Sequence, residues 1–335
     1  MTGSLALFGP LTRIGHRNIL NNSIISLLER AIRKRQPLKR HTNALRLVNG
    51  LGDNLNGLIL EQYNRHFVVQ IFEKRWLKEK EVLNGFVKTS CDGEYLIIKD
   101  RTESFSSQPD AFKTSIWSES GIPKTIVKEN GLNFEVDLND TLNSGLFLDM
   151  RNNRKIIAAL ACGKKVLNCF AYTCSFGVYC RAAGAKSVVN VDISAKGLSR
   201  GRYNYELNGL AATRNEFIRA DAVQYLKRAV DKNNRFDLII LDPPSFARYE
   251  GGNFNVRKDL SKIIGSAFEI LNPGGFLFVA TNFSGFLGKD LEDMVRKTAR
   301  GPIKKIQYLG QAEDFIGSGL MPESHLAALL VKMEN

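Results

Sequence analysis

Long apolar runs are absent from this sequence of 335 residues. No stretch approaches the roughly 18 apolar residues that suggest a membrane-spanning helix. The short LALF near the start lacks both a preceding charged segment and a following cleavage pattern. We therefore expect a folded, soluble, cytoplasmic protein that does not enter a membrane. Because residues 1–41 contain a single acidic residue, Glu29, an organelle transit peptide stays open as an alternative.

Cysteine and histidine are too few, and too badly spaced, for a disulfide framework or a metal site. The five cysteines are odd in number, four of them fall between Cys162 and Cys180, and none belongs to a CxxC pair. The four histidines lie away from this cluster. We expect reduced thiols and no bound metal.

Acidic residues are also in short supply. The chain has 34 of them against 47 lysines and arginines, which gives a net charge of +13 and an isoelectric point near 9.5. Eight of the basic residues lie within residues 1–41, where Glu29 is the only acid. Such an excess is typical of proteins that neutralise phosphates, and it predicts an RNA partner. A plain solvated surface is the alternative.

The apolar pattern divides the chain into three units. Residues 1–41 form a basic N-terminal helical segment, with apolar residues at helical spacing and basic residues 33–35 at its end. Residues 42–125 contain short β-rich stretches and one helix, which predict a small α+β RNA-binding domain whose polar last part, 101–125, is a linker. In residues 126–335 strands alternate with helices, which indicates a parallel sheet covered on both faces.

The turn after the first strand of this third unit is poor in glycine. The stretch VLNCFAYTCSFG contains only Gly177, although a turn that cradles a pyrophosphate needs several glycines for close backbone approach. The strands that follow end in Asp192, Asp221 and Asp242. In a parallel sheet these ends meet in one crevice, where three carboxylates repel phosphates and favour a cationic ligand. S-adenosylmethionine has a positively charged sulfur and no phosphate, and we expect it as the cofactor.

Individual roles follow from the order of these residues. Asp192 stands where an acid accepts hydrogen bonds from a ribose diol, and Asp221 where one accepts from the adenine amino group. The alternative for this region is helix capping, since Ser194 and Asp221 precede helical segments. The predicted cofactor-binding residues of these strand ends and turns are Asn168, Phe170, Tyr172, Thr173, Cys174, Asp192, Ile193, Asp221, Ala222 and Asp242.

The segment LDPPSF predicts the catalytic residues. Asp242 and Pro243 offer a carboxylate and a carbonyl without a competing backbone donor, which suits the amino group of a base. Phe246 is placed to stack on an extruded base. The alternative for Phe246 is a core phenylalanine.

With these residues identified, the chain resembles the class I methyltransferases of the bacterial 23S ribosomal RNA cytosine-C5 methyltransferase family. The likeness covers most of the chain, and GLFLDMRNNR together with VLNCFAYT, VVNVDIS and LDPPSF carries it. It implies an α/β fold: a Rossmann-like domain with a seven-stranded, mostly parallel sheet and a small N-terminal α+β domain. It also implies 23S ribosomal RNA as the partner, and it places Phe147 and Arg151 near the methionine end of the cofactor.

The chain departs from that family in two places. Only about forty residues, helical and basic, precede the α+β domain, where the family commonly carries a PUA domain. The family's Ser-Cys-Ser triplet corresponds here to Asn282, Phe283 and Ser284, and no cysteine follows Cys180. Cytosine C5 becomes nucleophilic only after a thiolate adds to C6. We therefore predict methyl transfer to a base nitrogen, with Asn282 hydrogen-bonded to the base.

Two questions stay open at this level, the activity and the oligomeric state. The alternatives to a nitrogen methyltransferase are a cytosine-C5 enzyme with a displaced nucleophile, a small-molecule methyltransferase, and a non-catalytic RNA-binding or assembly factor. The oligomeric state is also open, and a homodimer is one alternative.

Overall fold

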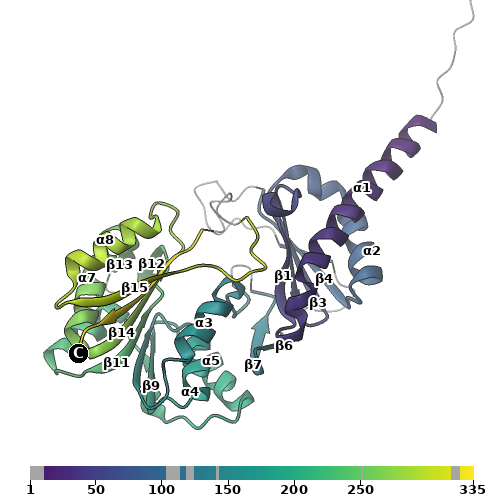
Figure 1. Cartoon of the computed structure of the whole chain (residues 1–335). Coiled ribbons are helices and arrows are strands. Elements are labelled where there is room, and N and C mark those ends of the chain that lie inside the picture. Colours follow the sequence, from purple (N-terminus) through teal and green to yellow (C-terminus); the bar gives the residue numbers. More distant parts are fainter. Residues whose placement is uncertain (1–10, 103–113, 118–123, 141–142, 250–251, 318–324) are drawn as a thin grey trace, which may run out of the picture.

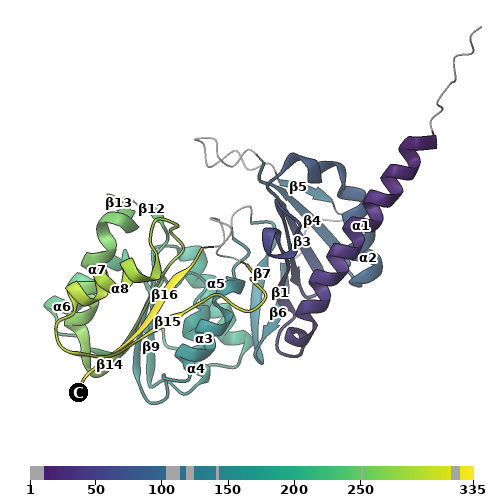
Figure 2. The ribbon, with the colours of Figure 1, turned by 45° about the horizontal axis from the view of Figure 1, so that its top comes forward.

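The structure is a computed structural model of the chain, and it describes residues 11–102, 114–117, 124–140, 143–249, 252–317 and 325–335. Two β-sheets lie side by side, joined by the hairpin of β6 (Lys124–Glu129) and β7 (Leu132–Asp137), as Figures 1 and 2 show. None of the helices in the described part of the chain combines the length and apolar character needed to span a membrane.

The N-terminal sheet has five strands in sequential order. They are β1 (Ala44–Asn49), β2 (Leu58–Tyr63), β3 (His66–Ile71), β4 (Tyr95–Asp100) and β5 (Thr114–Trp117). Only β3 and β4 run parallel, because the helix α2 (Lys80–Ser90) connects them and returns the chain to the same end of the sheet. The apolar sides of α2 and of the second half of α1 (Leu11–Arg35), from Ile24 onward, cover one face of this sheet around a core that includes Leu28, Leu47 and Phe86.

Strand β5 corrects one expectation. It lies inside the polar segment 101–125, which the sequence predicts as a linker, yet it pairs antiparallel with β4. Its four residues TSIW are β-branched, small or aromatic, so they suit a short edge strand. The rest of that segment, at 103–113 and 118–123, lies outside the described residues.

The second sheet has seven strands and confirms the predicted α/β fold class. Their order is β10-β9-β8-β11-β14-β16-β15, and only β16 runs against the others. The strands are β8 (Lys165–Cys169), β9 (Ser187–Asp192), β10 (Phe217–Arg219), β11 (Phe236–Leu241), β14 (Leu271–Thr281), β15 (Ile303–Leu309) and β16 (Ala327–Met333).

Helices cover both faces of this sheet, as a mostly parallel sheet with buried central strands requires. On one face lie α3 (Arg151–Ala158), α4 (Ser175–Ala182) and α5 (Ala195–Leu207); on the other lie α6 (Ala222–Asp231), α7 (Val256–Ile270) and α8 (Gly288–Thr298). A two-stranded hairpin, β12 (Phe246–Tyr249) and β13 (Gly252–Asn255), stands before α7. The domain division at residues 41 and 125 stays a prediction.

Buried ion pairs connect the two halves. Arg35, at the end of α1, is fully buried and donates to both carboxylate oxygens of Asp53 at 2.9 and 2.7 Å and to the carbonyl oxygen of Asp314. The Asp314 carboxylate in turn accepts from Arg151 and from the backbone N–H of Arg46 on β1. We call these residues the interdomain ion network. Arg35 is therefore not part of the exposed basic surface that the sequence predicts at residues 33–35.

Candidate active site

A cavity of about 550 Å³ opens where the parallel strands of the second sheet end. Its volume lies within the roughly 300–1,000 Å³ of small-molecule and cofactor pockets. The position agrees with the general rule that ligands of open α/β sheets bind beyond the carboxyl ends of the strands. The lining residues that the sequence predicts are Phe147, Phe170, Tyr172, Asp192, Ile193, Asp221, Ala222, Asp242, Pro243, Phe246 and Asn282. We call it the cofactor cavity.

The glycine-poor turn after β8 holds side chains in conformations that usually require glycine. Phe170, Tyr172 and Cys174 have φ angles of 57°, 47° and 59°, which cost on the order of 1–3 kcal/mol each for residues with a Cβ. Backbone hydrogen bonds keep the turn in place, because Ala171 N–H donates to the Val191 carbonyl at 3.0 Å. The alternating conformation directs Phe170 and Tyr172 to the cofactor cavity, while Cys174 is fully buried.

Asp192 ends β9 and is the anchor of this turn. Its carboxylate accepts the backbone N–H of Tyr172 and that of Ser194, both at 2.7 Å. Burial raises the pKa of Asp192 and the backbone hydrogen bonds oppose that shift. Two carboxylate oxygens offer about four lone-pair sites, so Asp192 has capacity left for a ligand in the cavity that it lines.

Ser194 and Asp221 both cap helices, as the alternative predicts. For Asp221, capping does not exclude contact with a ligand in the cofactor cavity. Ser194 Oγ accepts from Gly197 N–H at 3.0 Å at the start of α5. Asp221 Oδ1 accepts from Gln224 N–H at 2.9 Å at the start of α6. Asp221 also lines the cofactor cavity, where its carboxylate has a second oxygen to offer.

Two carboxyl groups lie close together at the deep end of the site. Asp242 follows β11, and burial together with the nearby charge of Asp149 raises its pKa to about 7. Burial raises the pKa of Asp149 as well, against the opposing effect of Arg46 and Arg154. Pairs of carboxyl groups with perturbed pKa values in a cleft are typical of functional sites. With a pKa of about 7, Asp242 is partly protonated near neutral pH, so it can both donate and accept a proton.

Sequence reasoning missed Asp149. The segment GLFLDMRNNR contains it, and the resemblance singled out its neighbours Phe147 and Arg151 instead. The sequence feature that could have identified it is an acidic residue among apolar ones, because an acidic side chain without a partner is costly to bury. Gly145 allows the segment to pass close to α5. It has a φ of +111°, and a Cβ there would meet the guanidinium of Arg200 at 2.0 Å.

Phe246 of the segment LDPPSF and Asn282 of the segment ATNFSG (280–285) both line the cofactor cavity. Phe246 is 49% exposed and lines the cofactor cavity, so the alternative of a core phenylalanine is wrong. Asn282 Oδ1 accepts the hydroxyl hydrogen of Ser245 at 2.8 Å. This bond turns the amide nitrogen of Asn282 away from Ser245.

Four predicted cofactor contacts lie elsewhere. Arg151, Asn168, Thr173 and Cys174 are buried and do not line the cofactor cavity. Their side chains point into the protein because each has a partner there. Arg151 pairs with Asp314, and Asn168 donates to Asn190 at 2.9 Å.

The other two of these residues hold the turn itself. Thr173 Oγ1 donates to the Gly145 carbonyl at 2.6 Å. Cys174 packs against Gly201, where a Cβ would meet its sulfur at 2.4 Å. These four side chains therefore support the backbone around the cofactor cavity, and the assignment of their residues to cofactor binding stays a prediction.

The composition of the cofactor cavity fits S-adenosylmethionine. Carboxylates at the strand ends suit its ribose and its positive charge, and the apolar side chains of Ile193 and Phe170 can pack against an adenine ring. In the described part of the chain, no three His, Cys, Asp or Glu side chains gather closely enough to hold a metal ion.

Comparison with known proteins agrees with this geometry. A family model described as S-adenosylmethionine-dependent methyltransferase matches residues 43–331. The chain belongs to this family. It is therefore a methyltransferase enzyme with S-adenosylmethionine as its cofactor. A solved structure of a methyltransferase complexed with SAH superposes with a TM-score of 0.82 at 26% identity, covering 93% of this chain and 82% of that one.

Two curated relatives of this methyltransferase carry more specific names. Ribosomal RNA large subunit methyltransferase I of Aeromonas salmonicida is 31% identical over 318 residues, which are 91% of this chain and 79% of the relative. Ribosomal RNA large subunit methyltransferase K of Neisseria meningitidis is 39% identical over 192 residues, which are 57% of this chain and 53% of the relative.

The first prediction concerns Asp192. Replacing it by alanine should weaken binding of S-adenosylhomocysteine by about ten- to a hundredfold, because the predicted charge-assisted hydrogen bond to the ribose is lost together with the bonds that anchor the turn. Isothermal calorimetry measures the affinity. Asp237→Ala is the matched control, because Asp237 lies at the opposite end of the sheet, at the start of β11. Undiminished affinity in Asp192→Ala would reject the assignment.

The second prediction follows from the raised pKa of Asp242. In the unfolded chain this group titrates near 3.8 and in the folded protein near 7, so between these values the folded state binds more protons. The contribution of Asp242 to stability is therefore complete below pH 4 and is lost as the pH rises to about 7. Urea denaturation of the cofactor-free protein at pH 5 and pH 8.5 measures it. Asp242→Asn should reduce the loss of stability between the two pH values, and an unchanged loss would contradict the shift.

Proposed function

We propose that this methyltransferase acts on a nucleobase of large-subunit ribosomal RNA, 23S ribosomal RNA in bacterial terms, and methylates a nitrogen rather than cytosine C5. The substrate class is supported by the names of its curated relatives, which are ribosomal RNA large subunit methyltransferases, and by the net charge of +13. The observation that carries the choice of nitrogen is the position of the cysteines.

No thiol lines the cofactor cavity, although all five cysteines belong to the described residues. Cys169, Cys174 and Cys180 are fully buried in the sheet and helix core. Burial raises the pKa of Cys180 to about 12 and that of Cys91 to about 11. A nucleophilic cysteine needs the opposite, a lowered pKa and access to the substrate. These positions favour a reaction without a protein thiolate.

Methylation at a base nitrogen does not require a nucleophilic side chain from the protein. When bound, S-adenosylmethionine supplies an electrophilic methyl group, and the lone pair of the base nitrogen is the nucleophile. The chain then has to hold the base and take up any proton that the nitrogen carries. Asp242 and Asp149 can take up that proton, and Pro243 offers only a carbonyl because it has no N–H. Asn282 can donate to the base, and the exposed ring of Phe246 can stack on it.

The exposed basic residues of α1 support RNA contact outside the active site. Arg30, Arg33 and Lys34 are exposed near the end of this helix, and Arg40 is exposed in the turn that follows. Cations grouped in this way neutralise phosphates without reading sequence. We propose that they bind the backbone of the RNA. The small-molecule alternative leaves this surface without a role.

The third prediction tests the nitrogen assignment. Ribosomal RNA from cells that lack this enzyme, prepared with 5-fluorocytidine in place of cytidine, should form no denaturant-stable adduct with the protein, because no thiolate adds to C6. With ordinary RNA, mass spectrometry of the nucleosides should find the methyl group on a base nitrogen. A cytosine-C5 methyltransferase serves as the positive control for the adduct.

A cysteine-free variant provides the second arm of this test. Cys91→Ser and Cys162→Ser combined with alanine at the three buried positions should retain methyl transfer if the fold survives, which circular dichroism checks. A trapped adduct together with loss of activity traced to one cysteine would establish the cytosine-C5 reaction instead.

A further inference from the structure

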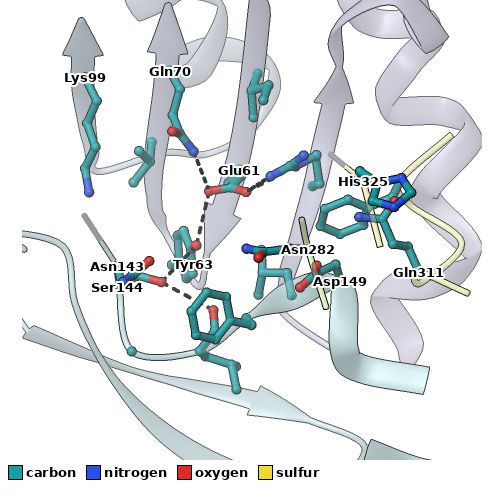
Figure 3. Close-up of a pocket in the computed structure, with 18 of the residues that line it drawn as sticks. Glu61, Tyr63, Gln70, Lys99, Asn143, Ser144, Asp149, Asn282, Gln311 and His325 are labelled. Atoms are coloured by element: carbon teal, nitrogen blue, oxygen red, sulfur yellow. Dashed lines mark hydrogen bonds and ion pairs between the residues drawn. The ribbon is translucent and has the colours of Figure 1, made fainter. Parts of the chain in front are cut away.

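A second cavity, of about 220 Å³, lies between the five-stranded sheet and the methyltransferase fold (Figure 3). Strands β1 to β4 form one side, and the segment 143–149 forms the other. It shares Asn143, Phe147, Asp149 and Asn282 with the cofactor cavity. The two cavities therefore meet at a common wall, and that wall contains Asp149 of the carboxyl pair. We call the second one the interdomain cavity.

The charges of the interdomain cavity balance. Arg46 and Lys99 are its cations, and Glu61 and Asp149 its carboxylates. The guanidinium of Arg46 already pairs with Glu61 through bonds of 2.7 and 3.1 Å, and it lies 4.1 Å from the ring centre of Phe315. A phosphate would need a clear excess of positive charge. This cavity instead suits a neutral ligand that both donates and accepts hydrogen bonds.

Polar side chains from the sheet are held in fixed orientations. The Tyr63 hydroxyl donates to Glu61 at 3.2 Å and accepts from Ser144 at 3.1 Å. Gln70 Nε2 donates to Glu61 at 3.4 Å, which identifies the amide oxygen of Gln70 as the end available for a ligand. Glu61 thus accepts hydrogen bonds from Arg46, Tyr63 and Gln70. It orients these side chains rather than binding a ligand.

Lys99 supplies donors on the same side. Its ammonium group is almost fully buried and donates to the Asp140 carbonyl at 2.6 Å. An ammonium has three N–H groups, so one bond leaves capacity for a ligand acceptor. Burial and the charge of Arg101 lower the pKa of Lys99. Figure 3 shows Gln70 and Lys99 extending from neighbouring strands on one side, and Asp149 and Asn282 on the other.

Apolar side chains complete the walls. Those that line the cavity are Ile59, Val68, Phe72, Leu146, Phe147, Leu148 and Phe315. A lining of apolar walls with a few fixed polar groups is the usual composition of a specific small-molecule pocket. At about 220 Å³, the cavity is smaller than the roughly 300 Å³ where pockets for drug-sized ligands begin. It therefore suits one planar ring system better than a whole nucleotide.

We propose that the interdomain cavity receives the target base after it leaves the RNA helix, and that Gln70 and Lys99 of the five-stranded sheet read its edge. This inference rests on the proposed RNA methyltransferase function. Extrusion is required because an enzyme cannot reach a base atom inside a duplex. The base then lies between the sheet and the shared wall, and its reacting edge meets the cofactor cavity at Asp149 and Asn282, which line both cavities, within reach of the groups that line the cofactor cavity alone, Asp242, Pro243 and Phe246. The N-terminal sheet becomes the element that selects the base.

The fourth prediction tests Gln70 and Lys99. Gln70→Leu and Lys99→Met keep the approximate size of each side chain and remove its hydrogen bonds to the base. Each should lower kcat/KM for methylation of ribosomal RNA about tenfold and leave calorimetric binding of S-adenosylhomocysteine unchanged. Gln62→Leu is the matched control, since Gln62 lies on strand β2 of the same sheet but does not line the cavity, and it should retain full activity.

Ultraviolet crosslinking locates the base without relying on activity. Wild-type protein with S-adenosylhomocysteine and ribosomal RNA is irradiated, and mass spectrometry maps the crosslinked peptides. The methylated nucleotide should crosslink to the peptide that contains Tyr63, which lines the interdomain cavity and not the cofactor cavity. Crosslinks of that nucleotide confined to other peptides, or full activity of Gln70→Leu, would overturn the inference. Wild-type protein that methylates no RNA would instead refute the proposed function, and this inference with it.

Discussion

The interdomain ion network is the constraint on which the arrangement of the two cavities depends. Burying Arg35, Asp53, Asp314 and Arg151 has a large desolvation cost, so such a network stabilises the fold only when every charge has a partner. Here one carboxylate, Asp314, is bonded from α3 and from β1, and its own carbonyl is bonded from α1. The network therefore specifies one relative position of the two sheets.

That position determines what the active site can do. The segment 143–149 lines both cavities, and it lies between Arg200, which donates to the Ser144 carbonyl at 2.9 Å, and Thr173, which donates to the Gly145 carbonyl. A second buried pair, Arg154 with Glu129, attaches α3 to the β6–β7 hairpin. A methyl acceptor and a methyl donor must approach to about 3–3.5 Å for reaction. Rigid attachment of both sides of the shared wall meets this requirement.

The sequence allowed much of the methyltransferase half to be predicted, and the reasons are physical. Alternating strands and helices and the strand-end acids at Asp192, Asp221 and Asp242 are local patterns that a parallel sheet imposes. The direction in which side chains point in the turn after a strand does not follow from such a local pattern. The positive φ angles at Phe170, Tyr172 and Cys174 depend on hydrogen bonds to the neighbouring strand β9, so the sequence did not separate cavity residues from supporting ones.

The features that escaped prediction all depend on distant contacts. Strand β5 consists of four residues in a polar segment, and only its pairing with β4 reveals it. Arg35 belonged to a basic run, and its burial follows from Asp53 and Asp314, of which Asp314 is 279 residues away in sequence. The interdomain cavity is lined by residues of β1 to β4, by the segment 143–149 and by Asn282, so no local sequence pattern predicts it.

Asp314→Asn tests most directly whether the interdomain ion network positions the two sides of the base site. It removes the negative charge of Asp314 and keeps the shape of its side chain. In protein shown to be folded by circular dichroism, kcat/KM for ribosomal RNA and the affinity for S-adenosylhomocysteine are compared with the wild type. The account predicts a loss of about tenfold or more in kcat/KM with an unchanged cofactor affinity, because only the base site spans both halves. Unchanged values of both, or equal losses in both, would contradict it.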